Sequence, residues 1–201
     1  MRQETAGVTE ALIESAKKEF LEYGFQNANL RRISADSGVS TNSIYTRFGD
    51  KSGLFSAVVK PAADGLMQIY LDSISGAEKC VSAEAATGMG DEGTELVLKY
   101  IYDNFDVFRL IFCNSAGTEY EDYFDRLAEI EESFYKKFAK HFTRDKECVS
   151  DFFIHVVCRT GWQYIYEVVS HNLSYEEAKD FMKSIREYSF AGWAKVLGAD
   201  F

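Results

Sequence analysis

The stretch SADSGVSTNSIYTRFGDKSGL, residues 34–54, places a glycine between two segments that both have the composition of helices. Gly38 can adopt a positive φ without steric cost, so the chain can turn sharply after Ser37. Ser40 then has a side chain suited to cap the next helix, which spans about residues 41–48. The stretch therefore predicts two helices joined by a tight turn, the arrangement of a helix-turn-helix.

The second of these helices has one apolar and one polar face. Ile44 and Phe48 are four residues apart and face inward, which puts Asn42 and Thr46 on the opposite side. A face of small hydrogen-bonding side chains suits the reading of base edges in a major groove. The side chains predicted to contact DNA are Thr41, Asn42, Ser43, Tyr45, Thr46 and Arg47.

Two segments upstream complete a small helical domain. Thr9 predicts the cap of a first amphipathic helix, and Gly24 predicts its end. Asn29 predicts the cap of a short second helix, from whose inward face Arg31 and Arg32 point away. These two helices supply the core against which the helix-turn-helix folds.

A fourth helix is expected directly after this DNA-binding domain, which we assign to residues 1–50. Asp50 can cap this linking helix, and Lys51 is its first residue. A basic side chain beside a free helix N-terminus favours a phosphate group, so Lys51 joins the predicted DNA contacts. Residues 51–201 then form a larger helical domain.

Charge is unevenly distributed along the 201 residues. The whole chain carries a net charge of -10, whereas residues 1–60 carry +1 and the remainder carries -11. Because an acidic surface is repelled by a polyanion, DNA has to be contacted by the N-terminal end. The composition, with 46% hydrophobic residues, one proline and no alternating β-branched runs, indicates an all-α chain with a sizeable core.

Cysteine spacing and hydropathy favour a cytoplasmic location. No CxxC spacing occurs, which indicates reduced thiols and leaves redox sensing as a minor alternative. The cysteines are Cys80, Cys113, Cys148 and Cys158. The first 30 residues hold no apolar segment behind a basic start, and no run of about 18 apolar residues occurs anywhere, so neither secretion nor membrane spanning is expected.

The run GFQNANLRRISADSGVSTNSIYTRFGDKSGLFSAV, residues 24–58, with ALIESAKKEF before it, resembles the N-terminal DNA-binding domain of the TetR family of bacterial transcriptional regulators. The resemblance spans about residues 9–59. The matching positions are Gly24, Phe25, Ile33, Gly38, Val39, Ser40, Tyr45, Phe48, Lys51 and Leu54. In that family the tyrosine and the lysine contact phosphate, which implies the same roles for Tyr45 and Lys51.

Departures from the family pattern concern sequence preference and loop stiffness. Thr41 and Asn42 stand where a Lys-Gly pair is common, and Gly49 replaces a usual proline. Arg47 can either read a guanine or hold a phosphate. The fold expectation is unaffected, but no operator sequence can be carried over from the family.

The larger domain is predicted to consist mainly of helices rich in aromatic residues. From Glu95 onward the chain holds 23 of its 30 aromatic residues, in helical stretches at about 95–115, 120–142, 147–171 and 174–197. The glycine-rich segment at residues 75–94 is expected to be a loop, with at most a weak helix. Pro61 predicts a kink or break of the linking helix near Val58.

The last two helical stretches are predicted to form a homodimer interface. The stretch 147–171 is apolar on nearly every side, and the stretch 174–197 has an apolar stripe at spacings of three and four. Together they resemble the antiparallel pair that TetR-family proteins use in a four-helix dimer interface, with a monomer core as the alternative. The residues expected across the two-fold axis are Phe153, Val156, Phe181, Ile185 and Trp193.

A small-molecule site is expected among the middle helices, because such sites are apolar with a few polar groups. The predicted lining is aromatic, with two polar side chains. It comprises Tyr102, Phe105, Phe108, Phe112, Phe134, Trp162, His155 and Arg159. Aromatic faces in an acidic domain favour a planar or cationic effector, while a neutral hydrophobic compound remains open.

No catalytic motif is present, so neither an enzyme nor a cofactor is expected. The sequence has no GxSxG, phosphate-binding glycine loop or HExxH, and EIEE at 129–132 has the pattern of a solvated helix face. His155 and Cys158 have metal-ligand spacing but lack a third ligand, so no metal site is expected.

The predicted function is a homodimeric repressor that a small molecule releases from double-stranded operator DNA. Two alternatives remain at this point: a DNA-binding regulator that answers to a protein partner, and a carrier or enzyme with a vestigial helix-turn-helix. The polar face of the 41–48 helix argues against the vestigial form.

Overall fold

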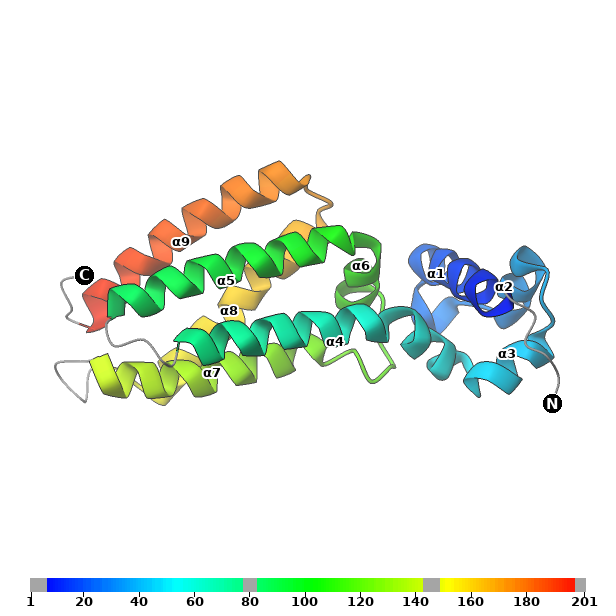
Figure 1. The fold of residues 1–201 in the computed structure, drawn as a ribbon, viewed down its shortest axis with the longest axis horizontal. Coiled ribbons are helices and arrows are strands. Elements are labelled where there is room, and N and C mark those ends of the chain that lie inside the picture. Colours follow the sequence, from blue (N-terminus) through cyan, green and yellow to red (C-terminus); the bar gives the residue numbers. More distant parts are fainter. Residues whose placement is uncertain (1–6, 78–82, 143–148, 198–201) are drawn as a thin grey trace. The chain divides into compact units, whose positions relative to one another are not determined.

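The computed structural model describes residues 7–77, 83–142 and 149–197, which consist of helices and short connections (Figure 1). This confirms the predicted all-α class. The chain divides into two compact units, the first running to Asp64 and also containing Asn104–Glu121. The second unit contains Gly65–Asp103 and the residues from Asp122 onward. The N-terminal unit defined by residue contacts thus extends beyond the domain boundary expected at residue 50.

The first unit consists of the first three helices, the start of the fourth helix and the sixth helix. It comprises α1 (Val8–Asn27), α2 (Leu30–Ser37), α3 (Thr41–Phe48), the start of α4 (Lys51–Ala77) and α6 (Phe105–Cys113). Helix α1 packs against α2 and α6, and α2 packs against α3. The fully buried side chains of this core include Leu12, Ala16, Phe20, Ile33, Ile44, Leu54 and Phe55.

Local signals for the helix-turn-helix are confirmed. Gly38 has φ 67° and ψ 12°, the left-handed conformation that lets the chain turn between α2 and α3. The Asn29 side chain accepts a hydrogen bond from the backbone N–H of Arg31 at 2.8 Å, which caps α2. The Ser40 hydroxyl accepts one from the N–H of Ser43 at 3.3 Å, which caps α3.

The structure differs wholly or in part from three boundary predictions in the first half of the chain. Helix α1 begins at Val8 instead of after Thr9, and it does not end at Gly24 but continues to Asn27. Gly24, with φ 69°, interrupts the helical backbone inside α1, so the sequence signal marks a kink. Helix α4 continues through Pro61, so of the kink or break predicted near Val58 the break is absent.

The second unit contains the remaining helices. These are α5 (Ala83–Asp103), α7 (Tyr123–Phe142), α8 (Asp151–Ser170) and α9 (Tyr175–Leu197), together with the later part of α4. Helix α7 packs along α8, and α5 packs along α9 (Figure 1). Three of the predicted helices are confirmed within the described residues, whereas the one at 95–115 is divided at Asn104 into α5 and α6.

The loop predicted at 75–94 is largely helix. Helix α4 continues to Ala77 and α5 begins at Ala83, while residues 78–82 lie outside the described residues. Residues 147 and 148, the first two of the helix predicted at 147–171, also lie outside them. A Cβ atom at Gly93 would lie only 3.0 Å from the Cβ of Ser73, so this glycine permits close packing of α5 on α4. Among the described helices, none combines the length and the apolar character needed to cross a membrane.

Candidate nucleic-acid interface and cavity

Helix α3 presents its polar face outward. Ile44 is fully buried and anchors the helix, whereas Asn42, Tyr45 and Thr46 are exposed, with 54% of Tyr45 accessible. The predicted side chains Thr41, Ser43 and Arg47 are half-buried. The exposed face thus has the position predicted for it, and its contact with DNA stays a prediction.

Several of the predicted DNA contacts already have protein partners, among them Arg47 and Thr46. Arg47 donates its Nε–H to the hydroxyl of Thr9 at 3.2 Å and so ties α3 to the start of α1. Thr46 donates its hydroxyl to the carbonyl of Asn42 at 2.8 Å, which leaves its oxygen lone pairs outward. Arg47 therefore helps to position the helix, and the outward face consists of Asn42, Tyr45 and Thr46.

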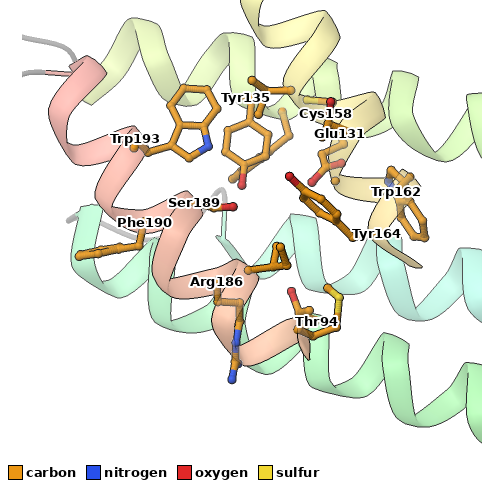
Figure 2. A pocket seen from close by; sticks show the side chains of 18 of the residues that line it. Thr94, Glu131, Tyr135, Cys158, Trp162, Tyr164, Arg186, Ser189, Phe190 and Trp193 are labelled. Atoms are coloured by element: carbon orange, nitrogen blue, oxygen red, sulfur yellow. The ribbon is translucent and has the colours of Figure 1, made fainter. Parts of the chain in front are cut away.

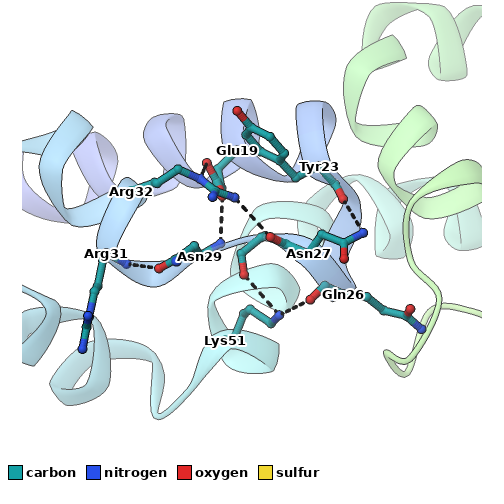
Figure 3. Close-up of polar contacts among 9 residues, drawn as sticks. Glu19, Tyr23, Gln26, Asn27, Asn29, Arg31, Arg32 and Lys51 are labelled. Atoms are coloured by element: carbon teal, nitrogen blue, oxygen red, sulfur yellow. Dashed lines mark hydrogen bonds and ion pairs between the residues drawn. The ribbon is translucent and has the colours of Figure 1, made fainter.

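The Lys51 ammonium lies against the end of α1 (Figure 3). Nζ donates to the carbonyl oxygens of Gln26 at 3.0 Å and Ala28 at 3.3 Å, and it lies 4.6 Å from the ring centroid of Phe25. A lysine at this place satisfies carbonyls that the helix leaves unpaired. Two of its three N–H donors are thus in use, and one remains for the predicted phosphate contact. The predicted cap of α4 is confirmed, since Asp50 Oδ1 accepts from the N–H of Gly53 at 2.8 Å.

A buried carboxylate joins α1 to α2, and Arg32 pairs with it instead of pointing away as predicted. Glu19 is only 8% exposed and accepts from the backbone N–H of Asn29 at 2.8 Å and from Arg32 Nε at 2.8 Å (Figure 3). The Arg32 guanidinium also donates to the carbonyl of Asn27 at 3.1 Å and lies 4.1 Å from the ring centroid of Tyr23. This network stabilises the short connection between α1 and α2, and with it the position at which α2 begins.

Replacing Glu19 with alanine is expected to lower the free energy of unfolding by about 2 kcal/mol, because the Asn29 N–H and the Arg32 side chain lose their shared acceptor. Urea denaturation followed by helical circular dichroism measures the loss. Glu14→Ala is the matched control, since Glu14 is an exposed glutamate on the same helix. Equal stability of the two variants would show that the network contributes nothing.

The second unit contains a cavity of about 810 Å³ (Figure 2). It is lined by residues of α4, α5, α7, α8 and α9, which are mostly apolar or aromatic. The aromatic side chains around it are Tyr70, Phe134, Tyr135, Phe138, Phe153, Trp162, Tyr164, Tyr188, Phe190 and Trp193. Its volume falls within the roughly 300–1,000 Å³ that is typical of small-molecule sites.

Only Phe134 and Trp162 of the eight predicted ligand-site residues line this cavity. Phe105, Phe108 and Phe112 lie on α6, which belongs to the first unit. These three residues therefore do not line the cavity. Aromatic side chains at helical spacing serve a hydrophobic core as readily as a binding site.

The three remaining predicted residues make contacts inside the second unit, away from the cavity lining. Tyr102 donates its hydroxyl to the carbonyl of Leu173 at 3.0 Å. His155 Nδ1 lies 2.8 Å from Glu132 Oε2, and Arg159 forms an ion pair with Asp125. His155 and Arg159 link α8 to α7, and Tyr102 links α5 to the connection before α9. From the sequence alone, polar residues with such structural roles cannot be distinguished from residues of a ligand site.

Glu131 is the cavity residue that the sequence pattern misassigned. It belongs to EIEE, predicted to be a solvated face, yet its Oε2 atom is shielded from solvent and has no hydrogen-bond partner among the described residues. Burial raises the pKa of this carboxyl to about 8, an effect that the Trp162 indole partly offsets. The hydroxyl of Tyr70, which also lines the cavity, is likewise buried without a partner there. The cavity therefore contains polar groups that a ligand can satisfy.

The first unit, with its α2–turn–α3 arrangement and exposed polar face, defines a helix-turn-helix protein. Residues 12–58 match the family described as bacterial regulatory proteins, tetR family. The match lies within the N-terminal domain and agrees with the resemblance seen in the sequence. The family is described as one of bacterial regulatory proteins.

Curated relatives are similar to the N-terminal part. The HTH-type transcriptional repressor AcnR of Corynebacterium glutamicum is 32% identical over 62 residues, which are 31% of this chain and 33% of the relative. The match thus spans about a third of the length of that repressor.

Solved structures with a similar fold cover nearly the whole chain. The TetR family transcriptional regulator PfmR from Thermus thermophilus has a TM-score of 0.63 at 14% identity, covering 94% of this chain and 97% of that one. The transcriptional regulator FadR from Bacillus subtilis, in complex with stearoyl-CoA, has a TM-score of 0.59 at 11% identity, covering 89% and 95%. At these identities the likeness shows a shared fold.

Proposed function

We propose that this protein is a sequence-specific DNA-binding transcriptional regulator, and that it acts as a homodimeric repressor released from its operator by a small molecule. The observation that carries the proposal is the outward polar face of α3, held by the buried Ile44 within the family-matching domain. Repression is supported by the description of AcnR as a transcriptional repressor. A ligand in the helical unit is supported by the cavity and by the stearoyl-CoA complex of FadR.

In this proposal α3 enters the major groove, and sequence is read by Asn42, Thr46 and, where its free N–H groups reach a base, Arg47. An asparagine side chain can pair with adenine through two hydrogen bonds. Tyr45 and Lys51 contact phosphates, Tyr45 from the exposed surface of α3 and Lys51 through the N–H that α1 leaves unused. Ser43 and Thr41 flank the face and contribute at its edge.

Lys51→Met is expected to reduce the slope of log affinity against log salt concentration by about 0.9 for each phosphate that the protein no longer binds. The reason is that each ammonium bound to a phosphate releases a condensed cation. Fluorescence anisotropy with an arbitrary 30-base-pair duplex is sufficient, because the interaction with phosphate does not depend on sequence. Lys60→Met is the control, since Lys60 is an exposed lysine on α4 paired with Asp64. An unchanged slope for Lys51→Met would mean that Lys51 does not bind phosphate and has only a structural role.

The homodimer interface is proposed on α8 and α9, with a revised set of residues. Ile185 and Trp193 line the cavity, and Phe181 packs on Tyr164 with ring centroids 6.1 Å apart. The large apolar side chains left exposed on the two helices are Phe152, Phe153, Val156, Tyr188 and Phe190. Three of these, Phe153, Tyr188 and Phe190, also line the cavity, whereas Val156 and Phe152, which is 75% exposed, do not. Large exposed apolar and aromatic side chains are typical of protein interfaces.

Val156→Asp is expected to convert the dimer to a monomer at micromolar concentration, because a buried unpaired charge in an apolar interface costs several kcal/mol. Sedimentation velocity measures the change. Ser133→Asp on the exposed side of α7 is the control and should leave the dimer intact. A wild-type monomer, or a dimer unaffected by Val156→Asp, would contradict the assignment.

A further inference from the structure

The Glu131 carboxyl is stabilised on one side by the Trp162 indole, but its Oε2 atom has no hydrogen-bond partner among the described residues. Its Oε2 atom and the Tyr70 hydroxyl are both shielded from solvent without a hydrogen-bond partner, and both residues line the cavity. A buried polar group left unpaired lowers the stability of the folded protein. Gly161 on α8 is the residue opposite Oε2, and a Cβ placed there would lie 3.7 Å from it, so backbone surface alone covers the oxygen from that side.

Glu131 is the only acidic side chain among the described residues that line the cavity (Figure 2). The titratable neighbours are Tyr70 on α4, Tyr135 on α7, Cys158 and Tyr164 on α8, and Arg186 and Tyr188 on α9, while α5 supplies Gly93, Thr94 and Val97. Burial raises the pKa of both the Tyr70 hydroxyl and the Cys158 thiol, so these two stay neutral near pH 7. Arg186 lies 3.6 Å from Glu95 of α5 and is directed away from Glu131 in Figure 2.

The aromatic walls favour positive charge on a ligand. Tyr135 and Trp193 are stacked with centroids 5.1 Å apart and ring planes at 2°, and Tyr70 meets Trp162 edge to face at 5.1 Å. Aromatic faces attract cations, most strongly where water is excluded. An ammonium placed among these rings would have Glu131 as its counter-ion.

We propose that the cavity binds a small molecule that carries a protonated amine on an apolar, aromatic body, with the Glu131 carboxylate as the acceptor of the ammonium. This deepens the proposed function and rests on the cavity being the effector site. Tyr70 supplies a second polar contact, and the aromatic walls hold the apolar body. The size of the cavity, about 810 Å³, admits a drug-sized compound.

Binding of such a cation is coupled to loss of a proton. With a pKa of about 8, Glu131 is mostly protonated at pH 6 to 7 in the empty cavity. The ammonium binds the ionised carboxylate, so the proton is released to solvent as the ion pair forms. Linkage then requires the affinity of a permanently protonated ligand to rise about tenfold per pH unit between about pH 6 and 7.

Three probes with one apolar body test the charge preference. These are 1-naphthylmethylamine, which is protonated below pH 8, the neutral 1-naphthylmethanol, and the anion 1-naphthylacetate. Isothermal titration or tryptophan quenching is used with the full chain and no DNA, at several pH values. The amine is expected to bind at least about tenfold more tightly than the alcohol at pH 7.5 and to show the pH dependence above, since charge-assisted hydrogen bonds are roughly twice as strong as neutral ones. The alcohol should show no pH dependence.

Glu131→Gln is expected to remove both the preference for the amine and its pH dependence, while retaining binding of the alcohol. Glu129→Gln, on the exposed side of the same helix, should retain the wild-type behaviour. Tighter binding of the alcohol or of the anion than of the amine would overturn the proposal, and so would an amine preference that survives in Glu131→Gln.

Failure of this inference and failure of the proposed function give different results. If neutral or acidic compounds release DNA while amines do not bind, the cavity is an effector site but not for amines. If amines bind through Glu131 and leave DNA affinity unchanged, the ligand class is correct and the coupling to DNA is wrong.

Discussion

Raising the pH from about 5 to 7.5 is expected to lower the free energy of unfolding of the wild-type protein, relative to Glu131→Gln, by ~1.4 kcal/mol per pH unit. The folded protein holds the pKa of Glu131 at about 8, above the usual 4.5 of the unfolded chain. Between these values the folded state binds more protons than the unfolded state, so stability falls as pH rises. Below the lower value the contribution is fully present, and above about pH 8 it is lost.

The measurement is urea denaturation of both proteins in one buffer series without ligand. Glutamine has no titration in this range, so the difference between the two stability curves isolates the carboxyl group. Glu129→Gln removes the same charge from an exposed position on α7, and its difference from the wild type should stay flat. Parallel curves for the wild type and Glu131→Gln would mean that the carboxyl is solvated, which would also remove the basis of the ammonium site.

Removing the outward side chains of α3 is expected to abolish discrimination between operator and random DNA. Loss of a base-contacting side chain such as Asn42 costs about 1–3 kcal/mol of discrimination, which is about 5- to 150-fold in affinity. Asn42→Ala and Thr46→Ala should lower operator affinity toward that for random DNA without a comparable change in the random-DNA affinity itself. Tyr45→Phe, which removes a hydroxyl proposed to contact phosphate, should instead weaken binding to both duplexes.

Anisotropy titrations with an operator duplex and a scrambled duplex separate these two patterns. Circular dichroism should show unchanged helix content, because all three side chains are exposed and Ile44 remains in the core. Glu14→Ala on α1 serves as the control for an exposed change elsewhere in the unit. Equal losses on both duplexes for Asn42→Ala would exclude base reading by that residue.

The helix-turn-helix could be predicted from sequence because its signals are local. Gly38, Asn29 and Ser40 act within three residues of their own positions, through a positive φ or a cap. The contact of Arg32 with Glu19, 13 residues earlier, and that of Lys51 with the end of α1 depend on how the helices pack. Such partners are set by tertiary structure, which periodicity along one helix does not contain.

The second unit shows where composition was misleading. Glycine content predicted a loop at 75–94, but Gly93 lets α5 pack closely on α4. This packing outweighs the weak helix propensity of glycine. Aromatic content predicted that a ligand site exists, yet Phe134 and Trp162 alone of the predicted lining face it. Glu131 was missed because a charged residue in EIEE has the pattern of a solvated face unless the neighbouring helices are known.

Selection of bound sequences from a random DNA library shows directly whether α3 reads an operator. The purified wild-type chain and a variant carrying Asn42→Ala, Tyr45→Ala and Thr46→Ala are selected in parallel at one salt concentration. The wild type should enrich an inverted repeat whose half-sites are about one helical turn apart or somewhat more, as a two-fold dimer with one recognition helix per subunit requires. The variant should enrich nothing. No enriched motif with the wild type, or the same motif with the variant, would contradict the proposal that α3 reads an operator.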